Sequence, residues 1–186
     1  MGSWFSNLHI RKRNSINVTR IADYIGKAMA EKQYMLATSK DEADGAFAIV
    51  SDEKSDWYSV YSDLFSFDEP KQFVDYATPI SDELKTDILG ISCFDSDFLY
   101  LNLIDAENNV DAWAGVGSAA GLGIRKRTNL SAWKNKVCDF EAFKESLKKE
   151  YVFAEEVLAE IEHCICLPQN NGAASYEYLS DYDLSK

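Results

Sequence analysis

The sequence contains few residues of the types that carry most enzyme chemistry. Its 186 residues include only 3 prolines, 2 histidines and 4 cysteines. Two histidines leave few general bases, and no serine lies in a G-x-S-x-G nucleophile elbow. These shortages argue against catalysis by an activated nucleophile, and no catalytic residue is assigned from the sequence.

Basic residues are also scarce, and the net charge is −12. Residues 37–111 hold 18 acidic and 4 basic residues, a net charge of −14. Such an acidic centre repels phosphate backbones, so we expect no nucleic-acid partner. Two basic triplets, Arg11–Arg13 and Arg125–Arg127, could form a local anion site if the fold brings them together. We favour a simpler interpretation, in which both are solvated turns that offset nearby acids.

Long hydrophobic runs are absent, and none approaches the roughly 20 residues of a membrane-spanning helix. The first basic cluster follows a short apolar run, which is the reverse of a secretory signal. Gly2 and Ser6 match a myristoylation pattern, but we interpret this stretch as a first strand. We therefore expect a cytoplasmic protein without membrane association.

The four cysteines lack the spacing of a disulfide framework. They lie in apolar or helical surroundings, so we expect buried free thiols in a reducing compartment. The sequence His163-Cys164-Ile165-Cys166 contains metal-binding residue types, but no second ligand pair accompanies it. We favour a packed helix end over a zinc site there, and we expect no cofactor.

The sequence does contain enough apolar residues to form a substantial core. It is 46% hydrophobic and 13% aromatic, enough for one packed domain at this length. The clearest stretch is Ile88–Val116, where two apolar runs are joined by Asp95-Ser96-Asp97 and a third follows Asn108-Asn109. The pattern predicts three consecutive antiparallel strands, and the first two are too apolar to have a wet face.

The remaining periodicity predicts strands at 4–12, 46–50 and 57–62, with helices starting near 18 and 70 and within 131–168. We expect Pro79 to interrupt the second helix. The resulting order favours an α+β fold with a mostly antiparallel central sheet, built as an extended ferredoxin-like core. We expect one domain over 1–168, with helices 131–168 packed on the sheet, and a flexible or loosely docked tail at 169–186.

Aspartates at expected strand ends are candidates for chemistry. Asp63, Asp95 and Asp97 could hold a hard cation or form an acid/base pair if the fold brings them together. Against this, Asp95-Ser96-Asp97 has the composition of a tight hairpin turn. A G-x-G-x-x-A match at 115–120 lacks the strand-and-helix context of a dinucleotide site, so it is weak.

Aromatic residues lie among these acids and suit a different role. Aromatic side chains anchor protein interfaces, while acids steer a basic partner. Most of the aromatics are equally compatible with a place in the core. The candidate partner-binding residues are Asp63, Phe65, Asp111, Trp113, Arg125, Lys126 and Arg127.

Several segments together carry a family resemblance that spans roughly Trp4–Leu167. They are EADGAFAIVS, WYSVYSDLFSFD, LGISCFDSDFLYLNLID, VDAWAGVG, SAWKNKV, DFEAFK and YVFAEEVL. The chain resembles an uncharacterised family of small acidic bacterial proteins that has no assigned activity. By analogy of class alone, such proteins are similar to immunity proteins, which neutralise a toxin domain. The resemblance implies no functional residue.

The leading hypothesis is a non-catalytic module that binds another protein, with a basic partner as its more specific form and immunity-like inhibition of a toxin as its most concrete one. The first alternative is a metal-dependent enzyme acting on an anionic small molecule, with Asp63, Asp95 and Asp97 as ligands. The second is a structural or regulatory module.

Overall fold

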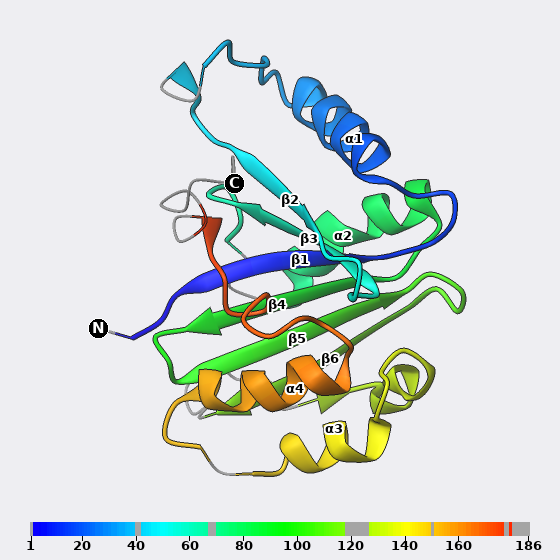
Figure 1. The fold of residues 1–186 in the computed structure, drawn as a ribbon, viewed down its shortest axis with the longest axis vertical. Coiled ribbons are helices and arrows are strands. Elements are labelled where there is room, and N and C mark those ends of the chain that lie inside the picture. The colour runs from blue at the N-terminus through cyan, green and yellow to red at the C-terminus, as the bar shows by residue number, and fades with distance from the viewer. Residues whose placement is uncertain are drawn as a thin grey trace.

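The computed structural model describes residues 2–39, 42–66, 70–117, 127–149, 151–176 and 179. They form one antiparallel sheet with helices on both faces, and Figure 1 shows α4 in front of the sheet and α2 behind it. The strands are β1 (Phe5–Arg11), β2 (Phe47–Ser51), β3 (Trp57–Ser62), β4 (Ile88–Phe94), β5 (Phe98–Asp105), β6 (Val110–Gly117) and β7 (Arg127–Thr128). The helices are α1 (Val18–Glu31), α2 (Pro70–Leu84), α3 (Phe140–Ser146) and α4 (Leu158–Cys164), with 3-10 turns η2 (Leu130–Asn135) and η3 (Ala154–Val157).

The sheet has the strand order β2-β3-β1-β4-β5-β6-β7, and every neighbouring pair is antiparallel. Its first four strands, with α1 and α2 as connections, have the order of a ferredoxin-like core. Strands β5, β6 and β7 extend that core beyond β4. The α+β fold and the extended ferredoxin-like arrangement predicted from the sequence are therefore confirmed.

The predicted three-strand segment forms β4, β5 and β6. Asp95 and Ser96 have positive φ angles of 49° and 59°, and the amide of Asp97 donates to the carbonyl of Phe94 at 2.9 Å. All eight residues of β5 are buried. The hairpin turn and the two-sided burial of the central strands both agree with the sequence pattern, because helices cover both faces of β5.

One core lies between the sheet and the layer of α1 and α2. Its fully buried members include Leu8, Val60, Phe73, Ala77 and Ile88. Helix α2 continues through Pro79, so the predicted interruption there was wrong. A proline removes one backbone donor from a helix, and the buried side chains on both sides of Pro79 hold the remaining turns against the sheet.

The second core lies on the opposite face, under η2, α3, η3 and α4. Trp133 stacks on Phe143 with ring centroids 4.9 Å apart, and both belong to one buried cluster with apolar residues of β4, β5 and β6. The helices expected within 131–168 thus pack on the sheet as α3 and α4, joined through η3.

Part of the predicted tail is docked. The side-chain amide of Asn7 donates to the carbonyls of Gly172 and Ala174 at 2.7 and 3.0 Å. The hydroxyl of Tyr61 donates to the backbone carbonyl of Asn171 at 2.9 Å. Residues 177–178 and 180–186 of that tail lie outside the described part of the chain. Within the described residues, no helix is long and apolar enough to cross a membrane.

Candidate functional site

Helix α1 is only partly packed on the sheet. Asn17 caps it, since its Oδ1 accepts from the amide of Arg20 at 2.9 Å. The helix is amphipathic, yet Ile21 is its only residue that is fully buried. Val18 remains 39% exposed. An amphipathic helix that buries so little of its apolar face leaves open space beside it, here between α1 and α2.

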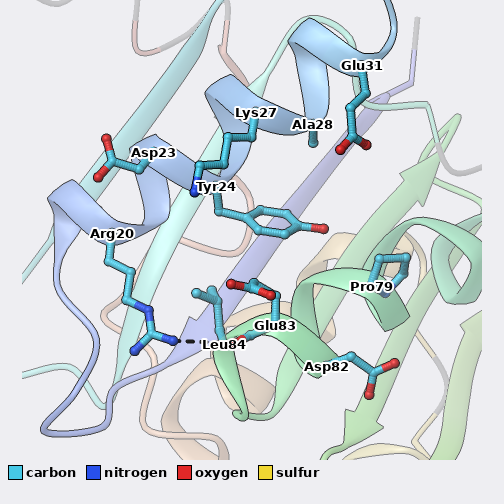
Figure 2. Close-up of a pocket in the computed structure, with 10 residues that line it drawn as sticks. All are labelled: Arg20, Asp23, Tyr24, Lys27, Ala28, Glu31, Pro79, Asp82, Glu83 and Leu84. Carbon is cyan, nitrogen blue, oxygen red and sulfur yellow. Dashed lines mark hydrogen bonds between the residues drawn. The ribbon is translucent and has the colours of Figure 1, made fainter.

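One part of this space is an open groove of about 590 Å³, which we call the acidic groove. Figure 2 shows the ring of Tyr24 reaching from α1 toward α2, with the side chain of Glu83 facing it. Arg20 crosses the groove and donates to the carbonyl of Glu83 at 3.3 Å. The lining residues are Arg20, Asp23, Tyr24, Lys27, Ala28, Glu31, Pro79, Asp82, Glu83 and Leu84.

The acidic groove is negatively charged on balance, because four carboxylates and two basic groups line it. Burial raises the pKa of Tyr24, and the nearby carboxylates of Glu31 and Glu83 raise it further. The phenol is therefore neutral at physiological pH and can donate a hydrogen bond to a ligand. The carboxylates favour a positively charged one.

The second part is a groove of about 320 Å³ near the C-terminal end of α1, which we call the aromatic groove. The ring of Phe65 lies edge-on to those of Phe47 and Tyr76, with centroids 5.8 and 5.5 Å away. Its lining residues are Met29, Lys32, Tyr34, Phe47, Leu64, Phe65, Ser66, Gln72 and Tyr76.

Large apolar side chains near this groove are exposed. Tyr34 is 47% and Leu64 40% exposed, and next to Tyr34 in the chain Met35 is 92% and Leu36 99% exposed. A gathering of exposed apolar side chains around a groove is typical of an interaction surface. The aromatic groove and its surroundings therefore offer anchor positions for another polypeptide.

Two of the predicted partner-binding residues lie at this place. Phe65 lines the aromatic groove. Asp63 follows β3, and its Oδ1 accepts from the amide of Ala46 at 2.9 Å, which ties the segment after β3 to the residue before β2. Asp63 thus shapes the loop that carries Phe65.

The other predicted residues lie elsewhere. Asp111 and Trp113 belong to β6, which β1, β4 and β5 separate from β3. Trp113 is half-buried, with its ring 5.8 Å from that of Tyr100. Arg125 and Lys126 lie outside the described residues, and Arg127 is described only as a backbone partner of Ala114 in β7. The structure does not bring Asp111 and Trp113 to the α1–α2 grooves.

The three candidate metal-binding aspartates do not form a cluster. Among the described residues, only one group of three or more His, Cys, Asp or Glu side chains has its ligand atoms close together, and it excludes all three. Asp95 instead accepts the amide of Gly2 at 3.1 Å. Asp63 and Asp97 belong to separate turns, so the enzyme alternative lacks its ligand set.

Arg11 and Arg13 of the first basic triplet offset nearby acids as expected, but Arg11 is the last residue of β1 and does not lie in a solvated turn. Arg11 pairs with Asp56 at 3.2 Å, and Arg13 lies 3.3 Å from Glu107 and 3.7 Å from Asp87. These contacts use the charge of the triplet within the fold. They leave no support for an anion site at Arg11–Arg13.

A buried ion cluster joins the helical layer to the sheet, and no local sequence pattern indicated it. Lys136 Nζ lies 3.0 Å from Asp87 Oδ1 and 2.8 Å from Asp105 Oδ1, and all three side chains are at most 6% exposed. Burial lowers the pKa of Lys136, but its hydrogen bonds to Asp105 and Asp87 outweigh burial and raise it. Arg11 donates to the Lys136 carbonyl at 2.7 Å. The cluster therefore has a structural role.

A second buried polar network surrounds His9. Its Nδ1 lies 2.9 Å from the Ser59 hydroxyl and its Nε2 lies 2.8 Å from Asn7 Oδ1. The three residue types resemble a catalytic triad, yet all are at most 1% exposed. Burial lowers the pKa of His9 to about 3, which keeps the imidazole neutral. With no access for a substrate, this network holds β1, β3 and the segment around Gly172 together.

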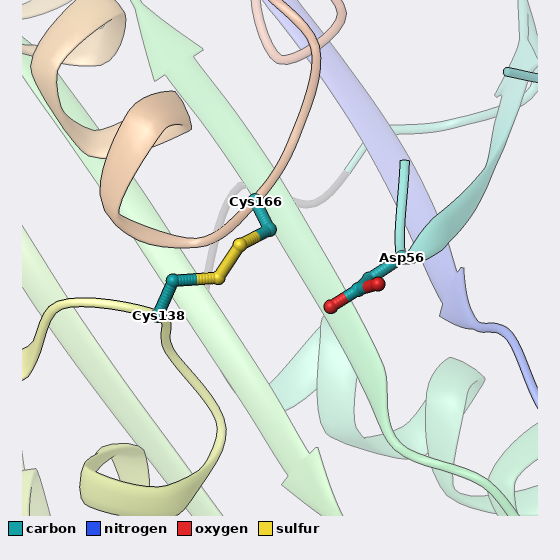
Figure 3. Close-up of side chains that lie close together, drawn as sticks. All are labelled: Asp56, Cys138 and Cys166. Atoms are coloured by element: carbon teal, nitrogen blue, oxygen red, sulfur yellow. A yellow bond between two sulfur atoms is a disulfide. The ribbon is translucent and has the colours of Figure 1, made fainter. Parts of the chain in front are cut away.

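The prediction of free thiols was wrong for two of the four cysteines. Cys138 and Cys166 form a disulfide with Cα atoms 6.1 Å apart, while Cys93 and Cys164 are free and buried as expected. The pair is 28 residues apart in sequence, and only the antiparallel return of α4 beside α3 brings the two together. The carboxylate of Asp56 lies close to the disulfide (Figure 3).

Comparison of this chain with protein-family models, curated proteins and solved structures gave no match.

Proposed function

We propose that this protein is a non-catalytic binding module that takes a basic polypeptide segment into the grooves between α1 and α2. The observation that carries the proposal is the lining of these grooves, acidic at one end and aromatic at the other. A net charge of −12 supports a basic partner as well.

The two grooves suit different parts of such a segment. Lysine or arginine side chains would meet Glu31, Asp82 and Glu83 in the acidic groove. A large apolar side chain would enter the aromatic groove beside Phe65 and would cover Leu64. Apolar anchors supply most of the binding free energy at such surfaces, and charges set the association rate and the choice of partner.

The test is selection from a displayed library of random peptides, followed by affinity measurement in solution. We expect the selected peptides to combine lysine or arginine with an aromatic or aliphatic anchor. Their affinity should fall as salt is raised, because salt screens exposed charge pairs. Enrichment of acidic peptides, or of none, would contradict the proposal.

A matched pair of variants locates the binding surface. Ala28 lines the acidic groove, whereas Ala30 is exposed on the same helix outside both groove linings. Ala28→Arg adds a positive charge and bulk to the groove, so we expect at least a tenfold loss of affinity, equivalent to about 1.4 kcal/mol. Ala30→Arg adds the same charge and should bind the selected peptides normally. Equal losses in both variants would place binding elsewhere.

The most concrete form of the proposal is a cytoplasmic, immunity-like inhibitor of a bacterial toxin, for which the basic segment belongs to the toxin. The resemblance to small acidic bacterial proteins supports this form by class analogy. Co-expression with toxin domains encoded beside this gene tests it. We expect the unchanged protein and the Ala30→Arg variant to rescue growth, and the Ala28→Arg variant to fail. Failure of both the unchanged protein and the Ala30→Arg variant to rescue growth would count against the immunity-like form.

A further inference from the structure

A cluster of two cysteines and one carboxylate lies apart from the α1–α2 grooves. Asp56 directly precedes β3, Cys138 precedes α3, and Cys166 follows α4. Their ligand atoms all lie within 4.8 Å of one another, and Figure 3 shows the Asp56 carboxylate directed toward the sulfur pair. Asp56 and Cys138 are exposed and Cys166 is half-buried, so small reagents can reach all three.

Backbone hydrogen bonds hold the three positions without the help of the disulfide. The carbonyl of Asp56 accepts from the amide of Lys12 at 2.8 Å, and the amide of Cys138 donates to the carbonyl of Cys164 at 2.6 Å. Next to Cys166, the carbonyl of Ile165 accepts from the buried indole of Trp57 at 2.8 Å. Breaking the sulfur–sulfur bond would therefore leave the two thiols beside Asp56.

We propose that reduction of the Cys138–Cys166 disulfide converts this cluster into a zinc site. A dithiol reductant supplies two electrons and two protons, so that the disulfide becomes two thiols and the reductant becomes a disulfide. Zn²⁺ then displaces the two thiol protons and binds both thiolates and the Asp56 carboxylate. The fourth position faces solvent and takes a water molecule.

The donor set selects the metal. Thiolates with a carboxylate are zinc ligands, whereas Mg²⁺ and Ca²⁺ require oxygen ligands. Tetrahedral zinc with Zn–S distances of about 2.3 Å places its two sulfurs roughly 3.8 Å apart and each sulfur roughly 3.5 Å from the carboxylate oxygen. Atoms that already lie within 4.8 Å of one another reach this geometry with side-chain movements of about 1 Å.

Arg11 supplies an outer partner for the site. Its Nη2 donates to Asp56 Oδ2 at 3.2 Å, so Oδ1 remains available to the metal. Two thiolates and one carboxylate would give a site with Zn²⁺ a formal charge of −1, which the guanidinium offsets. Outer hydrogen bonds of this kind orient a ligating carboxylate.

The experiment titrates the reduced full-length protein with Zn²⁺ and, separately, with Co²⁺ as a spectroscopic substitute. We expect one metal per chain and a sulfur-to-cobalt charge-transfer absorption. Cys138→Ser and Cys166→Ser should abolish this absorption, and Asp56→Asn should weaken zinc binding at least about tenfold. Cys164→Ala removes a buried thiol outside the cluster and should bind as the unchanged protein does.

A measurement on the unchanged protein keeps the proposal testable if a cysteine variant fails to fold. Zinc should protect Cys138 and Cys166 of the reduced chain from alkylation, as read by mass spectrometry of its peptides. Absence of zinc binding by the reduced chain would overturn the proposal. So would equal binding by the oxidised chain, or an Asp56→Asn variant that binds zinc as tightly as the unchanged protein.

Discussion

At the scale of single residues, the buried polar groups decide how this protein responds to pH. Glu162 accepts the amides of Asn170 and Gly172 at 2.9 and 2.6 Å, and His9 bonds to Asn7 and Ser59. Burial raises the pKa of Glu162, although these backbone amides lower it in part. The pKa of each group therefore differs between the folded protein and the unfolded chain, and stability depends on pH as a result.

His9 gives the clearest pH prediction. Its pKa is about 3 in the folded protein and 6.5 ordinarily, so below pH 6.5 the unfolded chain binds a proton that the folded protein does not. The free energy of unfolding should therefore fall as pH is lowered, by about 2 kcal/mol between about pH 7 and about pH 5 from this group alone. Urea titrations at both pH values measure it.

The His9→Gln variant should lose this part of the pH dependence, whatever its stability at neutral pH. The exposed His163 provides the matched control, and His163→Gln should keep the pH dependence of the unchanged protein. If His9→Gln and the unchanged protein lost equal stability between the two pH values, the folded imidazole would not be held neutral.

At the scale of elements, two glycines show how differently α1 and β4 are packed. A Cβ added at Gly26 of α1 meets nothing within 4 Å, whereas one added at Gly90 of β4 collides with the ring of Phe73. Strand β4 is therefore packed in tight contact with α2 at Gly90. Helix α1 has free surface, in keeping with its place beside the two grooves.

Opposite effects of the same substitution are expected from this contrast. Gly26→Ala should raise the free energy of unfolding by about 0.5–1 kcal/mol, because alanine restricts the unfolded chain and favours helix. Gly90→Ala should lower it by about 1–3 kcal/mol through overpacking against Phe73. Chemical denaturation of the two variants measures both, and a neutral Gly90→Ala would mean that the ring of Phe73 moves freely.

The elements themselves were largely predictable from the sequence, for local reasons. The stretch Ile88–Val116 contains uninterrupted apolar runs and turn residues at Asp95–Asp97, which specify strands and a hairpin without distant partners. The candidate site was predictable only in part. Phe65 was identified as an aromatic beside acids, but Tyr24 and Glu83 come from two helices whose mutual placement no local pattern encodes.

At the scale of the whole molecule, one sheet separates two helical layers, and buried polar groups tie the layer of η2, α3 and α4 to it. Lys136 is one of them, because it follows η2 and its ammonium group lies between Asp87 and Asp105 beside the ends of β4 and β5. The docked segment around Gly172 is another, since it closes the same face over Asn7. Loss of either connection should loosen the layers as a unit.

Lys136→Met tests this connection. It removes the buried cation that lies between two buried carboxylates, so we expect the free energy of unfolding to fall by about 3–5 kcal/mol. The exposed Lys134 is the control, and Lys134→Met should change stability by at most about 0.5 kcal/mol. Adding Asp87→Asn and Asp105→Asn to Lys136→Met should recover part of the loss. A Lys136→Met protein as stable as the Lys134→Met control would show that the cluster holds nothing together.

The strand and helix types, the antiparallel extended ferredoxin-like sheet and the net negative charge all follow from the sequence, because each depends on periodicity, turn residues or composition. Tertiary structure alone decided which distant residues meet: Cys138 with Cys166, Lys136 with Asp87, and α1 with α2 across an open groove. The physical reason is that contacts between separate elements depend on how completely each apolar face is covered, and coverage is a property of the packed molecule.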